Sequence, residues 1–137
     1  MRSAECGIMG ADRDDLRWRT KEFALRVIRL VNSLPNTPAA RTIGGQLIRA
    51  GTSVGSNYRA ACRARSSAEF RAKLGIVEEE ADESMFWIEL LIDAEIMKAE
   101  LLQDLLDEAN SITAMVVSSI WTSRNSSAKT TANRKPR

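Results

Sequence analysis

The chain has 137 residues, of which 44% are hydrophobic and only 5% aromatic, and its formal net charge is +2. This length suits one domain with a single core, and the low content of aromatic residues, glycine and proline favours helices packed through aliphatic side chains. The chain contains no histidine, no phosphate-binding glycine loop and no ligand-spaced cysteines. We therefore expect no catalytic residues, no metal site and no cofactor.

The weak net charge hides a strong separation of charge along the chain. Residues 41–73 carry seven basic residues and one acidic residue, whereas residues 78–108 carry twelve acidic residues and one lysine. The segment after Ser123 is again basic and has no acidic residue. Such separation creates strong local fields on a molecule that is nearly neutral as a whole.

The first half of the chain predicts an N-terminal arm and two helices. Residues 1–12 show no periodicity, so they are expected to form a flexible arm. Apolar residues at helical spacing then predict a helix from about Asp14 to Leu34. Thr37-Pro38 is a start signal for a second helix, with Thr37 as its N-cap. Its predicted inward positions are Ile43, Leu47, Ala50, Val54, Tyr58 and Ala61.

Glycines are frequent in this second helix, and each weakens a helix by roughly 1 kcal/mol relative to alanine. Gly51 and Gly55 lie one turn apart on it. We expect them to permit a close approach of a neighbouring helix; the alternative is a kink or break in this region.

The second half predicts two further helices and a tail. Ser66 and Glu69 form a capping box that starts a helix over residues 67–95. A turn near residues 95–99 leads to a last helix that ends near Ser123, and residues 124–137 are expected to form a disordered basic tail. Residues 13–123 are thus predicted to be an all-α, antiparallel, up-down-up-down four-helix bundle. The predicted inward positions of the helix over 67–95 are Phe70, Leu74, Val77, Ala81, Met85, Ile88 and Ile92.

Residues of the second and third predicted helices resemble a known family. The chain is similar to the small four-helix-bundle proteins encoded in intervening sequences of bacterial 23S ribosomal RNA genes, which look related to accessory proteins of diversity-generating retroelements. Gly55 stands where that family usually has proline, and Arg59-Ala60-Ala61 replaces its usual Ala-Glu-Gly. The matching positions are Arg49, Ala50, Ser53, Ser56, Asn57, Glu69, Phe70, Leu74 and Glu83.

The resemblance carries expectations about assembly and partners. It implies a four-helix bundle that forms a ring-like homo-oligomer, pentameric in related proteins. It also implies a nucleic-acid or ribonucleoprotein role, and it brings no catalytic residues.

The basic run is the leading candidate for a binding surface. Clustered arginines displace counterions from nucleic acids and bind phosphate oxygens in bidentate geometry. The alternative is that these cations pair with the acidic residues of the next helix, within one subunit or between subunits. The candidate nucleic-acid-binding residues are Arg49, Arg59, Arg63, Arg65, Arg71 and Lys73.

Four polar residues are interpreted as structural. Ser53, Ser56 and Asn57 suit a tight helix crossing, because the chain offers no base to activate a serine. Glu83 lies at the edge of the apolar stripe and needs a donor, for which Asn57 or an arginine of the second helix is expected.

Large aromatic residues exceed what the inside of a narrow bundle accommodates. Phe86, Trp87 and Trp121 are therefore predicted to form a subunit interface, with core packing as the alternative.

Taken together, these patterns predict a non-enzymatic, homo-oligomeric bundle that binds RNA or DNA through arginines at the link between the second and third helices. The alternative is a scaffold or adaptor whose arginines form intersubunit ion pairs. The N-terminus lacks a secretory apolar stretch, and the cysteines Cys6 and Cys62 do not resemble a disulfide framework. Both features favour a cytoplasmic protein without a membrane partner.

Overall fold

The structure, a computed structural model, describes residues 11–132, and these residues form helices without any strand. The four helices are α2 (Ala11–Ser33), α3 (Pro38–Cys62), α4 (Ser67–Asp93) and α5 (Ala99–Ala132). Short connections join them, so consecutive helices run antiparallel to each other.

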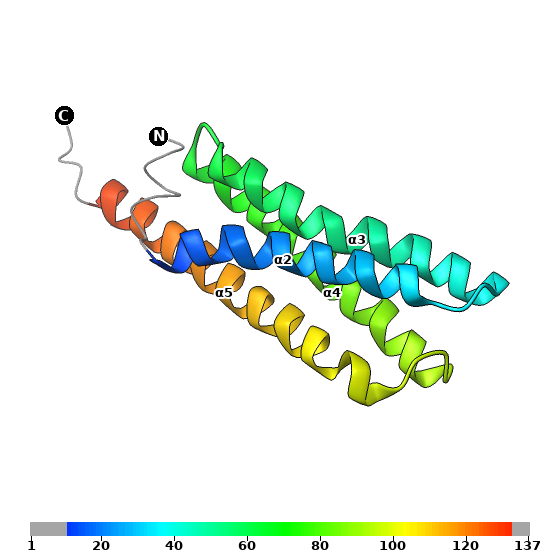
Figure 1. The fold of residues 1–137 in the computed structure, drawn as a ribbon. Helices are drawn as coiled ribbons and strands as arrows, with labels where there is room; N and C mark the ends of the chain where they lie inside the picture. Colours follow the sequence, from blue (N-terminus) through cyan, green and yellow to red (C-terminus); the bar gives the residue numbers. More distant parts are fainter. Residues whose placement is uncertain (1–10, 133–137) are drawn as a thin grey trace.

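The helices form one bundle in which each helix packs against two neighbours (Figure 1). α3 and α4 share the most extensive contact, while α2 closes the bundle against α5. The α3–α4 connection lies at the same end as the start of α2 and the end of α5, and the other two connections lie at the opposite end. This arrangement confirms the predicted up-down-up-down four-helix bundle.

The predicted start signals are present as hydrogen bonds. The Thr37 side chain accepts a hydrogen bond from the backbone N–H of Ala40, at 3.2 Å, directly ahead of α3. The Ser66 hydroxyl accepts one from the backbone N–H of Glu69, at 3.1 Å, ahead of α4. Both caps satisfy donors that a helix leaves unpaired at its first turn. The turn predicted near residues 95–99 is also present, and Glu95 occupies it with a positive φ of 58°.

The core consists of the apolar stripes of all four helices. The six inward positions predicted for α3 are all buried, including Tyr58. On α4 the prediction is wrong at two positions, because Ser84 and Leu91 are buried whereas Met85 and Ile92 are only partly buried. The buried positions of α4 recur at alternating steps of four and three residues, the seven-residue repeat of packed bundle helices, whereas the prediction departed from this repeat after Ala81.

Two glycines of α3 lie where α2 crosses it. A Cβ atom on Gly51 would lie 2.8 Å from both methyl groups of Val27, and one on Gly55 would lie 3.2 Å from the carbonyl oxygen of Thr20. α3 nevertheless continues as one helix through both positions. The close approach predicted for these glycines is therefore confirmed, and a break in the helix is excluded.

α5 extends further than the sequence predicted. It continues to Ala132 rather than ending near Ser123, because the segment contains neither glycine nor proline before Pro136. The predicted tail boundary at residue 124 is thus too early for the helix. The predicted N-terminal arm falls mostly on residues 1–10, and the last part of the predicted tail falls on residues 133–137; both lie outside the described residues.

Candidate nucleic-acid interface

The six basic residues predicted as a binding surface divide into two groups. Arg49 and Arg71 donate hydrogen bonds to neighbouring helices within the chain. Arg59, Arg63, Arg65 and Lys73 instead line hollows at the bundle end that carries the α3–α4 connection.

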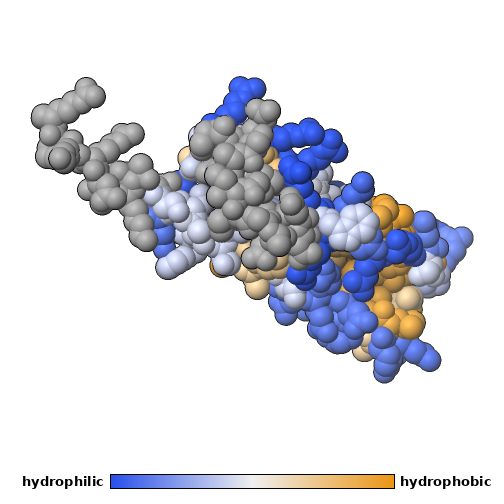
Figure 2. Space-filling view, turned by 60° about the vertical axis from the view of Figure 1, so that its left-hand side comes forward, coloured by the Kyte–Doolittle hydropathy of each residue, from blue (hydrophilic) through white to orange (hydrophobic). Residues whose placement is uncertain are grey.

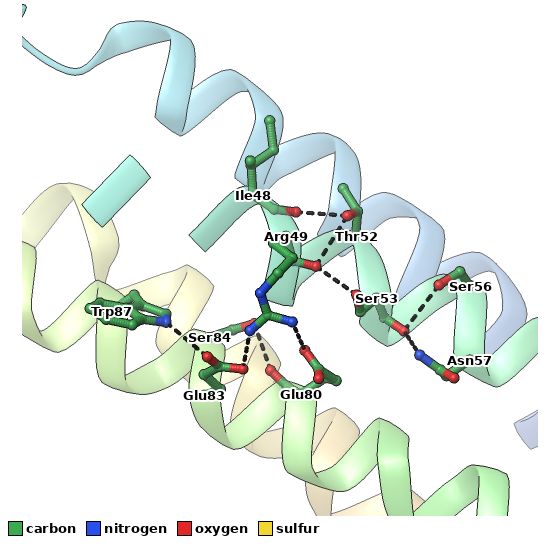
Figure 3. A network of polar contacts seen from close by, with 10 residues as sticks. All are labelled: Ile48, Arg49, Thr52, Ser53, Ser56, Asn57, Glu80, Glu83, Ser84 and Trp87. Atoms are coloured by element: carbon green, nitrogen blue, oxygen red, sulfur yellow. Dashed lines mark hydrogen bonds and ion pairs between the residues drawn. The ribbon is translucent and has the colours of Figure 1, made fainter. Parts of the chain in front are cut away.

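Arg49 links α3 to α4 through two carboxylates (Figure 3). Its guanidinium donates to Glu80 Oε2 at 3.2 Å and to Glu83 Oε2, and the indole N–H of Trp87 donates to the other Glu83 oxygen at 3.4 Å. The hydrogen bond from Arg49 is the main cause that lowers the pKa of Glu83, and the same bond raises the pKa of Arg49. Arg49 therefore provides the donor that Glu83 requires.

The small polar residues of α3 bond to their own helix. The hydroxyl of Ser53 donates to the carbonyl of Arg49 at 2.7 Å, while Ser56 and the amide of Asn57 both donate to the carbonyl of Ser53, at 3.3 and 2.9 Å (Figure 3). The Asn57 amide thus bonds within α3, and the donors to Glu83 are Arg49 and Trp87.

Arg71 connects α4 to α5. Its guanidinium donates to the hydroxyl of Ser123 at 3.2 Å and reaches the carbonyl of the same residue at 3.5 Å. Ser123 is buried, so this contact fixes α5 against the start of α4. The position suits a structural role for Arg71.

A groove of about 510 Å³ lies between α2 and α3. Arg17 and Lys21 of α2 line one side, and Arg59 of α3 and its C-cap residue Arg63 line the other. Among the residues whose side chains the structure describes, none that lines this groove is acidic. The groove lies where α2 approaches α3 at Gly55, which itself forms part of the lining.

Three hydroxyl groups in this groove donate their protons to backbone carbonyls. Thr20 and Thr52 donate to the carbonyls of Leu16 and Ile48, each at 2.7 Å, and Ser56 donates to its own helix as described above. These three hydroxyls are thus not available as donors to a ligand, whereas the cationic side chains of the groove are.

A second hollow, of about 460 Å³, adjoins the first and shares Arg59 and Arg63 with it. Arg65 and Lys73 complete its basic lining. Its one acidic residue, Glu69, accepts a hydrogen bond from the backbone N–H of Arg65 at 3.1 Å. The two hollows together present a surface that we call the basic face, formed by Arg17, Lys21, Arg59, Arg63, Arg65 and Lys73.

The basic face is electrostatically uncompensated within the described part of the chain. No described carboxylate lies within ion-pair distance of any of its six cations. Figure 2 shows strongly hydrophilic side chains along the upper edge of the bundle, while apolar surface gathers toward the right of the same view. A surface with unpaired cations on three helices attracts anions.

Sequence reasoning missed Arg17 and Lys21. Their spacing of four residues places them on the same side of α2, which was a usable signal. That side could be assigned to the groove only once the crossing of α2 and α3 was known.

The predicted interface aromatics are largely exposed. Phe86 is 53% exposed, Trp121 is 67% exposed, and Trp87 is half-buried. The rings of Phe86 and Trp87 meet edge to face, with centroids 4.9 Å apart. Trp18, which the sequence did not single out, is 60% exposed on α2.

Cys62 does not behave as the sequence suggested. It is only 3% exposed and is not a free thiol in the structure. The argument from unpaired cysteines for a reducing compartment therefore does not hold at this residue. Cys6 lies outside the described residues.

Within residues 11–132, no helix combines the length and the apolar character that crossing a membrane requires. The fold and the site together define a small four-helix bundle with an anion-attracting face at one end.

The chain belongs to the 23S rRNA-intervening sequence protein family, whose model matches residues 15–118. This establishes the family that the sequence resembled. The fold is also similar to the crystal structure, at 1.70 Å resolution, of a protein with unknown function from the S23 ribosomal protein family of Bacteroides thetaiotaomicron VPI-5482. The two chains are 34% identical, the TM-score is 0.74, and the match covers 78% of this chain and 96% of the other. A comparison with curated proteins found no match.

Proposed function

We propose that this protein is a non-enzymatic, homo-oligomeric bundle that binds RNA or DNA through its basic face. The observation that carries the proposal is the gathering of six cations from α2, α3, α4 and the α3–α4 connection at one end of the bundle, with no described carboxylate within ion-pair distance. Phosphate binding draws its free energy from such cations, because each phosphate contact releases condensed counterions.

The residue set differs from the one that the sequence suggested. Arg49 and Arg71 are engaged with α4 and α5, so they support the fold rather than the ligand. Arg17 and Lys21 take their place, because they line the same groove as Arg59 and Arg63. The proposed nucleic-acid interface is thus the basic face as defined above.

The test is a fluorescence anisotropy titration with a labelled RNA at several salt concentrations. The wild-type protein should bind with an affinity that falls steeply as salt rises. The double variant R59A/R63A should bind more weakly at every salt concentration, and its salt slope should be shallower by about 1.5 to 2. Circular dichroism would show that the variant keeps its helical content.

The double variant R41A/K98A is the matched control. It removes the same charge from Arg41 and Lys98, at the starts of α3 and α5 at the opposite end of the bundle. Its affinity should stay within about twofold of the wild type. Equal weakening in both double variants would show that net charge, rather than the basic face, drives binding.

A scaffold or adaptor is the second candidate function. It is favoured by the outer side of α4, where Glu79, Asp82 and Glu89 are exposed and form no ion pair within the described residues. In that case the basic face would pair with these carboxylates on another subunit. R59A/R63A would then lower the assembly mass in light scattering, and the wild type would not bind RNA even at low salt.

A further inference from the structure

One large aromatic side chain lies beside the cation-lined groove. Trp18 is 60% exposed and follows Arg17 directly in the sequence of α2. Lys21, the second α2 cation of the groove, is three residues further on, which places it next to Trp18 on the helix surface. Trp18 lines neither hollow of the basic face, but it neighbours Lys21 at the solvent-facing edge of the α2 wall of the groove.

Nothing in the described residues uses this indole. Its N–H donates no hydrogen bond to them, and its ring forms no aromatic pair with them. The apolar positions of α2 that build the core, such as Phe23 and Val27, lie on the opposite side of the helix. Trp18 therefore contributes little to the core, and its exposed ring is available to a ligand that extends past Lys21 out of the groove.

The shape of the site discriminates between kinds of nucleic acid. Proteins that read a duplex usually place a protruding helix or ribbon into one of its grooves. Here the cations line a hollow between two helices, and they stand on both of its sides. A positively charged hollow of this kind suits a single phosphodiester backbone. Proteins that hold single strands combine such a groove with exposed aromatic rings on which the bases stack.

We propose that the groove between α2 and α3 holds a single-stranded nucleic acid, with its phosphates on Arg17, Lys21, Arg59 and Arg63 and a base stacked on Trp18. This inference rests on the proposed function and narrows it to one class of ligand. Stacking needs no particular base, so the site accepts many sequences.

The experiment compares a labelled single-stranded RNA without self-complementarity with a labelled duplex RNA of the same length, at one salt concentration. The wild-type protein should bind the single strand about tenfold more tightly than the duplex. W18A should weaken single-strand binding by about tenfold, the loss expected for one base stack, and should leave duplex binding within about twofold. W18F should retain most of the single-strand affinity because phenylalanine still stacks.

The matched control is L25A. Leu25 is also an exposed apolar residue on the outer side of α2 and neighbours Lys21 as Trp18 does, but its aliphatic side chain offers no ring on which a base can stack. Its replacement should leave both affinities unchanged. The mass of W18A is also measured by light scattering, because contact with a second copy of the chain is the alternative role for Trp18.

Each outcome bears on the inference. Equal affinity for the two RNAs, or a W18A variant that binds the single strand as well as the wild type does, would overturn it. A W18A variant that loses assembly mass and keeps single-strand affinity would assign Trp18 to self-association. If R59A/R63A still weakens binding in these cases, the proposed function survives. If the wild type binds neither RNA at low salt, both proposals fail.

Discussion

Arg49 lies on the same helix as Arg59, yet its guanidinium binds Glu80 and Glu83 of α4. Replacing Arg49 should therefore affect the stability of the fold but not the affinity for nucleic acid. The side chain is 49% exposed, and exposed ion pairs contribute little to stability, so R49A should lower Tm by no more than about 5 °C. RNA affinity should stay within about twofold of the wild type. A loss of binding as large as that of R59A/R63A would place Arg49 in the ligand site.

Glu83 gives this contact a pH dependence. Its pKa in the folded protein is lowered, first by the hydrogen bond from Arg49, so the carboxylate stabilises the fold above the ordinary glutamate pKa of about 4.3. This stabilisation is lost as the pH falls through the lowered pKa. We expect E83Q to have a lower Tm than the wild type at neutral pH, by a few degrees at most, and the difference to shrink below about pH 4.

Thermal unfolding of both proteins across this pH range provides the measurement. E79Q is the matched control, because Glu79 is exposed on the same helix and forms no ion pair within the described residues. Its Tm difference from the wild type should be small and should not follow the same pH profile. A difference for E83Q that grows toward acid would contradict the prediction.

At the level of helices, the crossing of α2 over α3 depends on Gly51. A methyl group there would lie 2.8 Å from both methyl groups of Val27, which is fully buried. The clash should cost about 1–3 kcal/mol, which exceeds the roughly 1 kcal/mol that alanine gains over glycine in a helix. G51A should therefore reduce the free energy of unfolding by up to about 2 kcal/mol, measured by urea titration.

Gly45 supplies the opposite case on the same helix. It is exposed, and a Cβ atom there would meet nothing within 4 Å. G45A should therefore raise the free energy of unfolding by about 0.5–1 kcal/mol. If G51A proved as stable as G45A, the close packing of α2 on α3 would be incorrect.

These local features explain why the bundle could be predicted from sequence. Thr37 and Ser66 mark helix starts because their side chains satisfy backbone donors only a few residues away. The glycines of α3 signalled a tight crossing because their low helix propensity requires compensation elsewhere. The end of α5 was missed because the polar residues after Ser123 include no residue that stops a helix before Pro136.

The binding site was less predictable than the fold. Clustering in the sequence placed Arg49 with Arg59 and Arg63, but the α4 carboxylates that engage Arg49 lie about thirty residues further along the chain. Arg17 enters the groove only because α2 crosses α3, and a pattern within one helix does not contain this information. The direction of a long charged side chain depends on the whole set of neighbouring helices.

At the scale of the whole molecule, several large apolar side chains remain exposed on the surface of the single bundle. Phe86 and Trp121 are both more than half exposed, although they are large and apolar. Trp87 packs edge to face against Phe86 and donates to Glu83, so the position of Phe86 is linked to the α3–α4 contact. Exposed apolar groups of this size usually become buried when subunits associate.

We therefore expect the protein to self-associate through these aromatics. In light scattering, the wild type should have a mass that is a multiple of the 15.2 kDa of one chain, and F86S/W121S should shift it toward a single chain. Trp87 is left unchanged because its loss would also remove a donor to Glu83. The control is L101S, since Leu101 is also 67% exposed but lies at the first turn of α5, far along that helix from Trp121. A wild type that scatters as one chain, or a control that dissociates as readily as F86S/W121S, would show that these aromatics do not hold subunits together.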